Sequence, residues 1–167
     1  NPSVHGIVEV DSARLSWGKH QIPIRDLQSR VTFSDTSYQV EFAQFRYQDY
    51  PVTLTGNGTL QPSFNGEISL QPSGTIAIVY TADQNHSVMA HIREFPAQVL
   101  QQFIPAELRH YGYINARLNA ANISKNITLE TDGSWSEENE ESLAGWTYQW
   151  NMNYANSLIR INESALQ

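Results

Sequence analysis

Apolar and polar residues alternate along most of this chain, and glycine, proline, asparagine and aspartate interrupt the alternation at short intervals. Successive side chains of a β-strand point to opposite faces, so this period of two predicts many short antiparallel strands. The predicted strands are Gly6 to Val10, Arg14 to Trp17, Leu27 to Phe33, Tyr38 to Tyr47, Val52 to Leu60, Gly66 to Leu70, Thr75 to Thr81, Ser87 to Arg93, Tyr111 to Ala121, Lys125 to Trp135, Trp146 to Tyr154 and Ser157 to Asn162. We expect an all-β fold with a curved, mostly antiparallel sheet.

The strand from Tyr38 to Tyr47 changes parity along its length. Tyr38, Val40 and Phe42 share one face, whereas Phe45 and Tyr47 fall on the opposite parity. A single extra residue in one strand shifts the parity of everything that follows it. The aromatic side chains therefore stay on one face only if a β-bulge lies near Ala43 or Gln44.

The clearest alternation lies near the end of the chain, where apolar side chains take one face and Thr147, Gln149, Asn151 and Asn153 take the other. A second set alternates in the same way around residues 114–118. Both strands are long enough to cross a sheet, so we expect the two sets to line one apolar interior. The candidate lining residues are Ile114, Ala116, Leu118, Trp146, Tyr148, Trp150 and Met152.

One segment, Phe95 to Leu108, has helical rather than strand periodicity. Pro96 suits the first turn of a helix, an apolar stripe follows, and Pro105 forces a stop or a kink. The polar side of this segment carries glutamines rather than lysine or arginine, so membrane binding is disfavoured. We expect one short amphipathic helix that plugs one end of the β structure.

Charge and composition exclude several function classes. The 167 residues carry a formal net charge of −7 without any basic run, which argues against a nucleic-acid partner. Four glutamates between Glu137 and Glu141 contribute much of this charge, and they predict an exposed acidic loop. These carboxylates lack the ligand spacing and the glycine turn of a calcium loop, so a solvated loop is favoured over a metal site. The composition as a whole fits one folded, β-rich unit spanning residues 1–167.

No catalytic or cofactor motif is found. The five histidines are scattered and do not show the paired spacing of a zinc site, cysteine is absent, and no nucleophile elbow surrounds any serine. His91 shares its parity with Met89, which predicts an outward position on an edge strand. We expect a protein that is not an enzyme and that carries no cofactor or metal.

The order of the segments resembles the AsmA-like superfamily. In that group, strands, an Asp-Leu pair and glycines recur in a fixed order. The first half of this chain follows the same order, with the segments Gly6-Ile7-Val8-Glu9-Val10, Ile22 to Leu27, and Gly56-Asn57-Gly58-Thr59-Leu60. The helix-like Phe95-Pro96-Ala97 segment, followed by Gly112 to Leu118, is similar to an element that recurs in the TamB and YdbH branches. The type II secretion protein N is a nearby relative with the same rhythm. The resemblance covers most of the chain, but Pro105 and the acidic loop have no counterpart in the pattern of that family.

This resemblance implies a function. The family members are bridge-like lipid transfer proteins without catalytic residues, in which a long β-groove crosses the periplasm and conducts phospholipid acyl chains between the inner and outer membranes. The chain would then be a segment of a longer, repeat-like periplasmic protein, tethered to the inner membrane by a part outside these 167 residues. Its partners would be phospholipid acyl chains and other envelope proteins, the latter through the open edges of the sheet.

Two other functions stay open at this point. The four tryptophans and eight tyrosines are compatible with a secreted β-sandwich that binds carbohydrate or protein, although aromatic residues on alternating strands are more often core. A component of a secretion machinery is the other alternative. A sandwich needs two sheets closed over a common core, whereas a groove needs one sheet with an uncovered apolar face.

Overall fold

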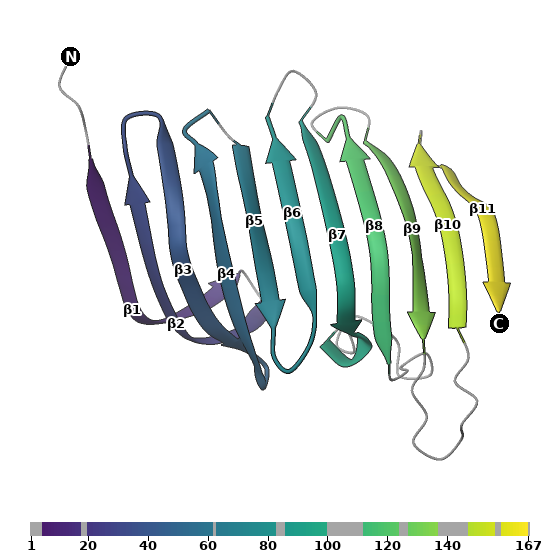
Figure 1. Ribbon diagram of the computed structural model, residues 1–167, viewed down its shortest axis with the longest axis horizontal. Coiled ribbons are helices and arrows are strands. Elements are labelled where there is room, and N and C mark those ends of the chain that lie inside the picture. The colour runs from purple at the N-terminus through teal and green to yellow at the C-terminus, as the bar shows by residue number, and fades with distance from the viewer. Residues whose placement is uncertain are drawn as a thin grey trace.

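The computed structural model describes residues 5–17, 20–61, 63–82, 86–99, 112–123, 127–136, 147–155 and 158–166. These residues form eleven strands in a single antiparallel sheet, and the order of the strands in the sheet is their order in the sequence. Figure 1 shows them side by side, from β1 at one edge to β11 at the other. The strands are β1 (Gly6–Trp17), β2 (His20–Phe33), β3 (Ser37–Tyr47), β4 (Tyr50–Thr59), β5 (Ser63–Leu70), β6 (Thr75–Thr81), β7 (Ser87–Pro96), β8 (Tyr113–Ala121), β9 (Thr128–Ser136), β10 (Thr147–Ala155) and β11 (Leu158–Leu166).

The sheet is open: β1 and β11 do not pair with each other, and the described residues form no second sheet. The predicted all-β fold with an open, antiparallel sheet is confirmed. Two of the predicted strands, Gly6 to Val10 and Arg14 to Trp17, join into the single strand β1, because the chain continues through bulges instead of turning.

The bends in β1 and β2 occur at residues with a left-handed backbone. Ser12 and Asp26 have φ angles of 58° and 56°, and each lies within a register shift, between Val10 and Ala13 and between Arg25 and Gln28. Bulges of this kind increase the local twist and turn the strand. Beyond them, the two strands leave the plane of the sheet together (Figure 1).

The predicted bulge in β3 is confirmed, but it lies slightly earlier than expected. Glu41 and Phe42 together oppose a single residue of β4, between the pairs Val40 with Gly56 and Ala43 with Leu54. The extra residue resets the parity, so that Val40 and Ala43 lie on the same face although they are three positions apart. The aromatic residues that follow therefore return to the apolar face.

A second bulge, in β7, was not predicted. Ile92 pairs with Ala116 and Phe95 pairs with Ile114, so Arg93 and Glu94 of β7 together oppose a single residue of β8, Asn115. The bulged residue Glu94 has a φ of 47°, and its backbone N–H donates to Asn115 Oδ1 over 2.9 Å. This bulge returns Phe95 to the apolar face.

The buried core lies at one end of the sheet. Val52, Leu70, Phe95 and Val99 pack together with exposures of 4 to 8%, and partly buried aromatic and aliphatic residues of β3 to β8 surround them. Ala97 N–H donates to the carbonyl of Gly112 over 2.9 Å at this end of the sheet. Away from this cluster, the apolar side chains are mostly half-exposed.

The prediction of a helix over Phe95 to Leu108 needs a correction at its start. Phe95 and Pro96 are the last residues of β7, paired with Ile114 and Tyr113, and 97–99 form one turn of 3₁₀ helix. The bulge at Glu94 keeps these two residues in the ladder, which the period of the sequence does not reveal. Residues 100–108 lie outside the described residues, as do Trp146 and the acidic loop at 137–141.

Candidate functional site

The register of the sheet brings the two predicted apolar sets together on either side of β9. Ala116 of β8 and Trp150 of β10 both pair with Gly133, and Leu118 and Met152 both pair with Thr131. Ile114 and Tyr148 pair in the same way with Trp135. Directly opposed residues of an antiparallel ladder point to the same face. Six of the seven candidate residues therefore share one surface, in rows that run across the strands.

Trp150 lies at the centre of this surface. A Cβ at Gly133 would lie 2.5 Å from Trp150 Cζ2, so the indole ring covers the position where a side chain of Gly133 would be. The indole N–H donates to Thr131 Oγ1 over 3.4 Å, and the Tyr148 and Trp150 rings stack with their centroids 6.5 Å apart. An aromatic ring packed over a glycine on the neighbouring strand compensates for the missing glycine side chain.

The same arrangement recurs on β3 to β5. Gly58 lies under the ring of Tyr38, and Gly56 and Gly66 lie under the ring of Phe64. All of these residues belong to the face that carries Trp150, as the pairings from β4 through β9 show.

Apolar residues continue this face across the sheet, one strand after another. Strands β4 to β7 contribute opposed pairs such as Leu54 with Ile68, Ile76 with Ile92 and Ile78 with Ala90. At the β11 edge, Ile159 and Ile161 oppose Tyr154 and Met152. We call this surface the apolar face. Its residues, taken from the paired registers, include Val8, Val10, Ile24, Val31, Phe33, Tyr38, Val40, Ala43, Phe45, Tyr47, Tyr50, Val52, Leu54, Phe64, Ile68, Leu70, Ile76, Ile78, Tyr80, Val88, Ala90, Ile92, Phe95, Ile114, Ala116, Leu118, Ala120, Leu129, Trp135, Tyr148, Trp150, Met152, Tyr154, Ile159 and Ile161, with glycines, Ser29 and Thr131 between them.

We expect the Gly133→Ala substitution to destabilise the sheet by about 1–3 kcal/mol, because the new methyl group overlaps the Trp150 ring and the backbone oxygen of Asn115. Urea unfolding monitored by circular dichroism measures the change. In the double variant with Trp150→Ala, part of the penalty should disappear, since the ring no longer has to move. An unchanged or higher stability of Gly133→Ala would contradict the packing described for Trp150.

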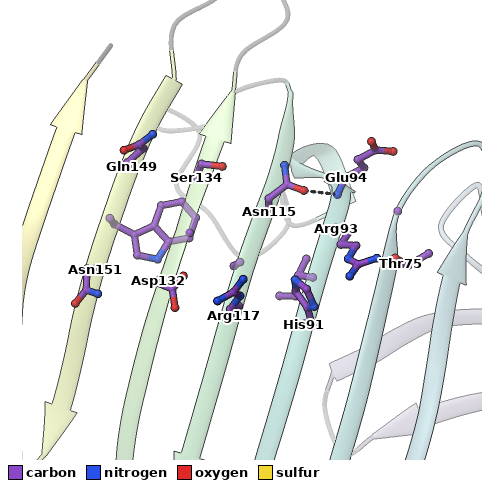
Figure 2. Close-up of a pocket in the computed structure, with 15 residues that line it drawn as sticks. Thr75, His91, Arg93, Glu94, Asn115, Arg117, Asp132, Ser134, Gln149 and Asn151 are labelled. Atoms are coloured by element: carbon purple, nitrogen blue, oxygen red, sulfur yellow. Dashed lines mark hydrogen bonds between the residues drawn. The ribbon is translucent and has the colours of Figure 1, made fainter.

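The opposite face of the sheet is polar, and it holds a shallow hollow of about 900 Å³ over β6 to β10. Figure 2 shows its side chains, which project in cross-strand rows such as His91, Arg117, Asp132 and Asn151. Arg93, Arg117 and Asp132 are exposed, and among the described residues they form no ion pair. Charged side chains that reach into water in this way are typical of the solvated side of a sheet.

The histidine and acidic side chains of the described residues are dispersed over the sheet. They contain no group of three or more histidine, aspartate or glutamate side chains that could hold a metal ion. His91 points outward as expected, but β7 is an inner strand of the sheet rather than an edge. His86, in the turn between β6 and β7, shares a hydrogen bond of 2.9 Å with the hydroxyl of Tyr80. Within the same residues, no helix is long and apolar enough to cross a membrane.

Sequence reasoning missed the contribution of β9. Thr131, Gly133 and Trp135 lie between the two predicted apolar sets, and Trp150 packs on two of them. The alternation of β9 is weak because a threonine and a glycine occupy apolar-face positions. The cross-strand signal, a glycine facing a tryptophan, becomes visible only when the register is known.

Comparison with known proteins gives no relative: no protein-family model, no curated protein and no solved structure matches the chain significantly.

Proposed function

We propose that this chain is a non-catalytic segment of an envelope protein, and that its apolar face holds phospholipid acyl chains as they pass between the inner and outer membranes. The observation that carries the proposal is the combination of one open sheet with apolar residues on the same face of every strand. In the proposal, the segment lies in the periplasm and belongs to a protein tethered to the inner membrane. The resemblance of its motifs to AsmA-like proteins supports this location.

Physical chemistry favours lipid on such a surface. Covering apolar area gains about 25 cal/mol per Å², or roughly 0.8 kcal/mol for each methylene removed from water. Half-exposed side chains on the apolar face, such as Trp150 and Met152, still present area to a ligand. An acyl chain covers this area and has no polar groups that need partners.

The dimensions of the sheet also suit a path. Eleven strands at a spacing of about 4.8 Å extend over about 48 Å, roughly three times the hydrocarbon depth of one leaflet, about 15 Å. A single acyl chain lying across the strands therefore covers only part of the face. Lipids would move by small steps across the strands, because the side chains that the structure describes on the apolar face carry no charge.

The single sheet of the described residues supports a groove rather than the alternative of a carbohydrate- or protein-binding sandwich. A sandwich buries such a face against a second sheet, and the described residues form one sheet. The aromatic residues on the apolar face also lie among aliphatic ones, and the polar groups of Tyr38 and Trp150 are hydrogen-bonded within the sheet.

Native mass spectrometry of the purified chain tests the proposal. We expect phospholipid to co-purify, and we expect delipidated protein to take up phospholipid from vesicles of phosphatidylethanolamine and phosphatidylglycerol. Soluble oligosaccharides serve as the comparison ligand. The proposal fails if the chain remains lipid-free in both experiments.

A further inference from the structure

The two ends of the strands differ in polarity. At the end that is uppermost in Figure 1 lie the connections β2–β3, β4–β5, β6–β7, β8–β9 and β10–β11. Leu60, Ile123 and Ile127, in the described parts of these connections, are 63, 41 and 39% exposed. A single exposed aliphatic residue needs no explanation, but these three lie at the same end, on turns that are usually polar. We call this end, with its connection residues 34–36, 60–61, 82, 86, 122–123 and 127, the Leu60 end.

Backbone hydrogen bonds between neighbouring connections hold these residues in place. Leu60 N–H donates to the carbonyl of Thr36 over 3.0 Å, which joins the β4–β5 connection to the β2–β3 connection. Ile123 N–H donates to the carbonyl of His86 over 3.3 Å, which joins the β8–β9 connection to the β6–β7 connection. Because the backbone groups of Leu60 and Ile123 are paired in this way, the exposure of their side chains is a property of the folded turns.

A row of aromatic residues crosses the apolar face just inside the Leu60 end. The hydroxyl of Tyr38 donates to the carbonyl of Ser63 over 3.0 Å, and the hydroxyl of Tyr80 shares a hydrogen bond of 2.9 Å with His86 Nδ1. Both partners lie nearer the Leu60 end than the row itself, so the polar tips of these rings face that end. Rings with an apolar body and a polar tip are enriched where a membrane meets water. The aromatic residues of the row, taken from the paired registers, are Phe33, Tyr38, Phe64, Tyr80 and Tyr154.

Charge is sparse at the Leu60 end. Asp35 is the only aspartate, glutamate, lysine or arginine among the described connection residues of this end. The whole chain carries a net charge of −7, so an anionic membrane surface does not attract it electrostatically. Contact of this end with a bilayer would therefore depend on the burial of apolar side chains.

The opposite end of the apolar face is closed by the buried cluster. Val99, in the 3₁₀ turn that follows β7, packs there against Val52, Leu70 and Phe95. Gly58 in the aromatic row and Val52 in the cluster are six positions apart on β4, which corresponds to about 20 Å. The hydrocarbon depth of one leaflet is about 15 Å. An acyl chain that enters from the Leu60 end therefore fits along the strands before it reaches the cluster.

We propose that the Leu60 end contacts a lipid bilayer, and that phospholipid enters the apolar face from the bilayer at this end, with its acyl chains directed toward the buried cluster. The contact is inferred from the exposed turn residues, the aromatic row and the lack of charge. The entry of phospholipid rests, in addition, on the proposed function. Acyl chains that enter in this way pass from one apolar environment to another without crossing water.

Flotation of the delipidated 167-residue chain with vesicles of phosphatidylethanolamine and phosphatidylglycerol tests the contact. We expect the chain to float with the vesicles at low and at high salt, because an apolar contact is not screened. Leu60→Ser and the double variant Ile123→Ser/Ile127→Ser should each bind at least tenfold more weakly, with unchanged circular dichroism. Met89→Ser is the matched control, since Met89 is 54% exposed on the polar face of β7, and it should bind like the unmodified chain.

Because the chain contains no cysteine, a single introduced cysteine can carry a polarity-sensitive fluorophore that reports the orientation on the vesicle. The emission from Leu60→Cys should shift to shorter wavelength when vesicles are added. Gln71→Cys should show no shift, since Gln71 is exposed in the β5–β6 connection at the opposite end (Figure 1). A chain that does not float, serine variants that float normally, or equal shifts at the two ends would each overturn the contact.

Lipid uptake distinguishes a failure of the entry step from a failure of the proposed function. Leu60→Ser should take up phospholipid from the same vesicles at least tenfold more slowly than the unmodified chain, as measured by native mass spectrometry. A short-chain phospholipid that dissolves in water should bind equally to both, because it reaches the apolar face from solution. If the unmodified chain binds neither lipid, the proposed function and the entry step both fail. If Leu60→Ser takes up vesicle lipid at the normal rate, only the entry step fails.

Discussion

Trp150→Glu is expected to abolish cross-linking to a phospholipid with a photoreactive acyl chain, while the sheet remains folded. Trp150 lies on the apolar face near the β11 edge of the sheet, between Tyr148 and Met152 on β10 and over Gly133 of β9. A carboxylate there has no cationic partner among the described residues of this face, and an acyl chain cannot solvate it. We expect at least a tenfold loss of cross-linked lipid.

Folding should survive because the position is only half-buried, so that water reaches the new carboxylate when no lipid is bound. Leu118→Glu, on β8 and also half-buried, should have the same two effects. Thermal unfolding by circular dichroism, measured in parallel with cross-linking, separates a folded variant without lipid from an unfolded one.

Gln149→Glu is the matched control for the added charge. Gln149 is the neighbour of Trp150 on β10, exposed on the polar face and opposite Ser134. Its replacement should leave both lipid cross-linking and stability unchanged. If Trp150→Glu and Leu118→Glu unfold the chain, the apolar face is a sealed core, and if the unmodified chain never cross-links lipid, the proposed function is wrong.

Phe95→Ala is expected to cost about 3–5 kcal/mol of unfolding free energy, because it removes a large aromatic ring from the buried cluster at one end of the sheet. Phe95 is 8% exposed and packs with Val52, Leu70 and Val99 in that cluster. The cluster is small for a chain of this length, and typical domains are stable by only about 5–15 kcal/mol. The variant should therefore lose a large part of its stability, as measured by urea denaturation.

Met89→Ala provides the comparison, because Met89 lies on the same strand, β7, with 54% of its surface exposed. Its truncation should change the unfolding free energy by no more than about 0.5 kcal/mol. Equal effects of the two substitutions would show that the cluster around Phe95 does not hold the sheet together.

The sequence alone predicted most of the strands and most of the faces on which their side chains lie. Phe42 is an exception, since it was expected on the face of Tyr38 and Val40. The bulge instead pairs Phe42 with Arg30 and so places it on the polar face. The alternation from Tyr148 to Tyr154 corresponds to an apolar and a polar side of β10, and the parity change in β3 correctly required a bulge. Both are local properties: a strand places every second side chain on the same side, whatever it pairs with. The position of that bulge was off by one or two residues, since the pattern shows that parity is reset but not where.

Features that depend on pairing between distant residues were decided by the tertiary structure. The bulge at Glu94 keeps Phe95 and Pro96 in β7, and the register of β9 brings Leu118 close to Met152 through Thr131. The openness of the sheet also depends on how distant strands pair, because alternation on each strand is equally compatible with one sheet or with two sheets closed over each other. The sequence determined which side chains share a face, whereas the pairing of the strands determined that the apolar face is continuous and that no second sheet of the described residues covers it. The physical reason is that parity is set within a strand by its own backbone, while register and closure depend on hydrogen bonds between strands.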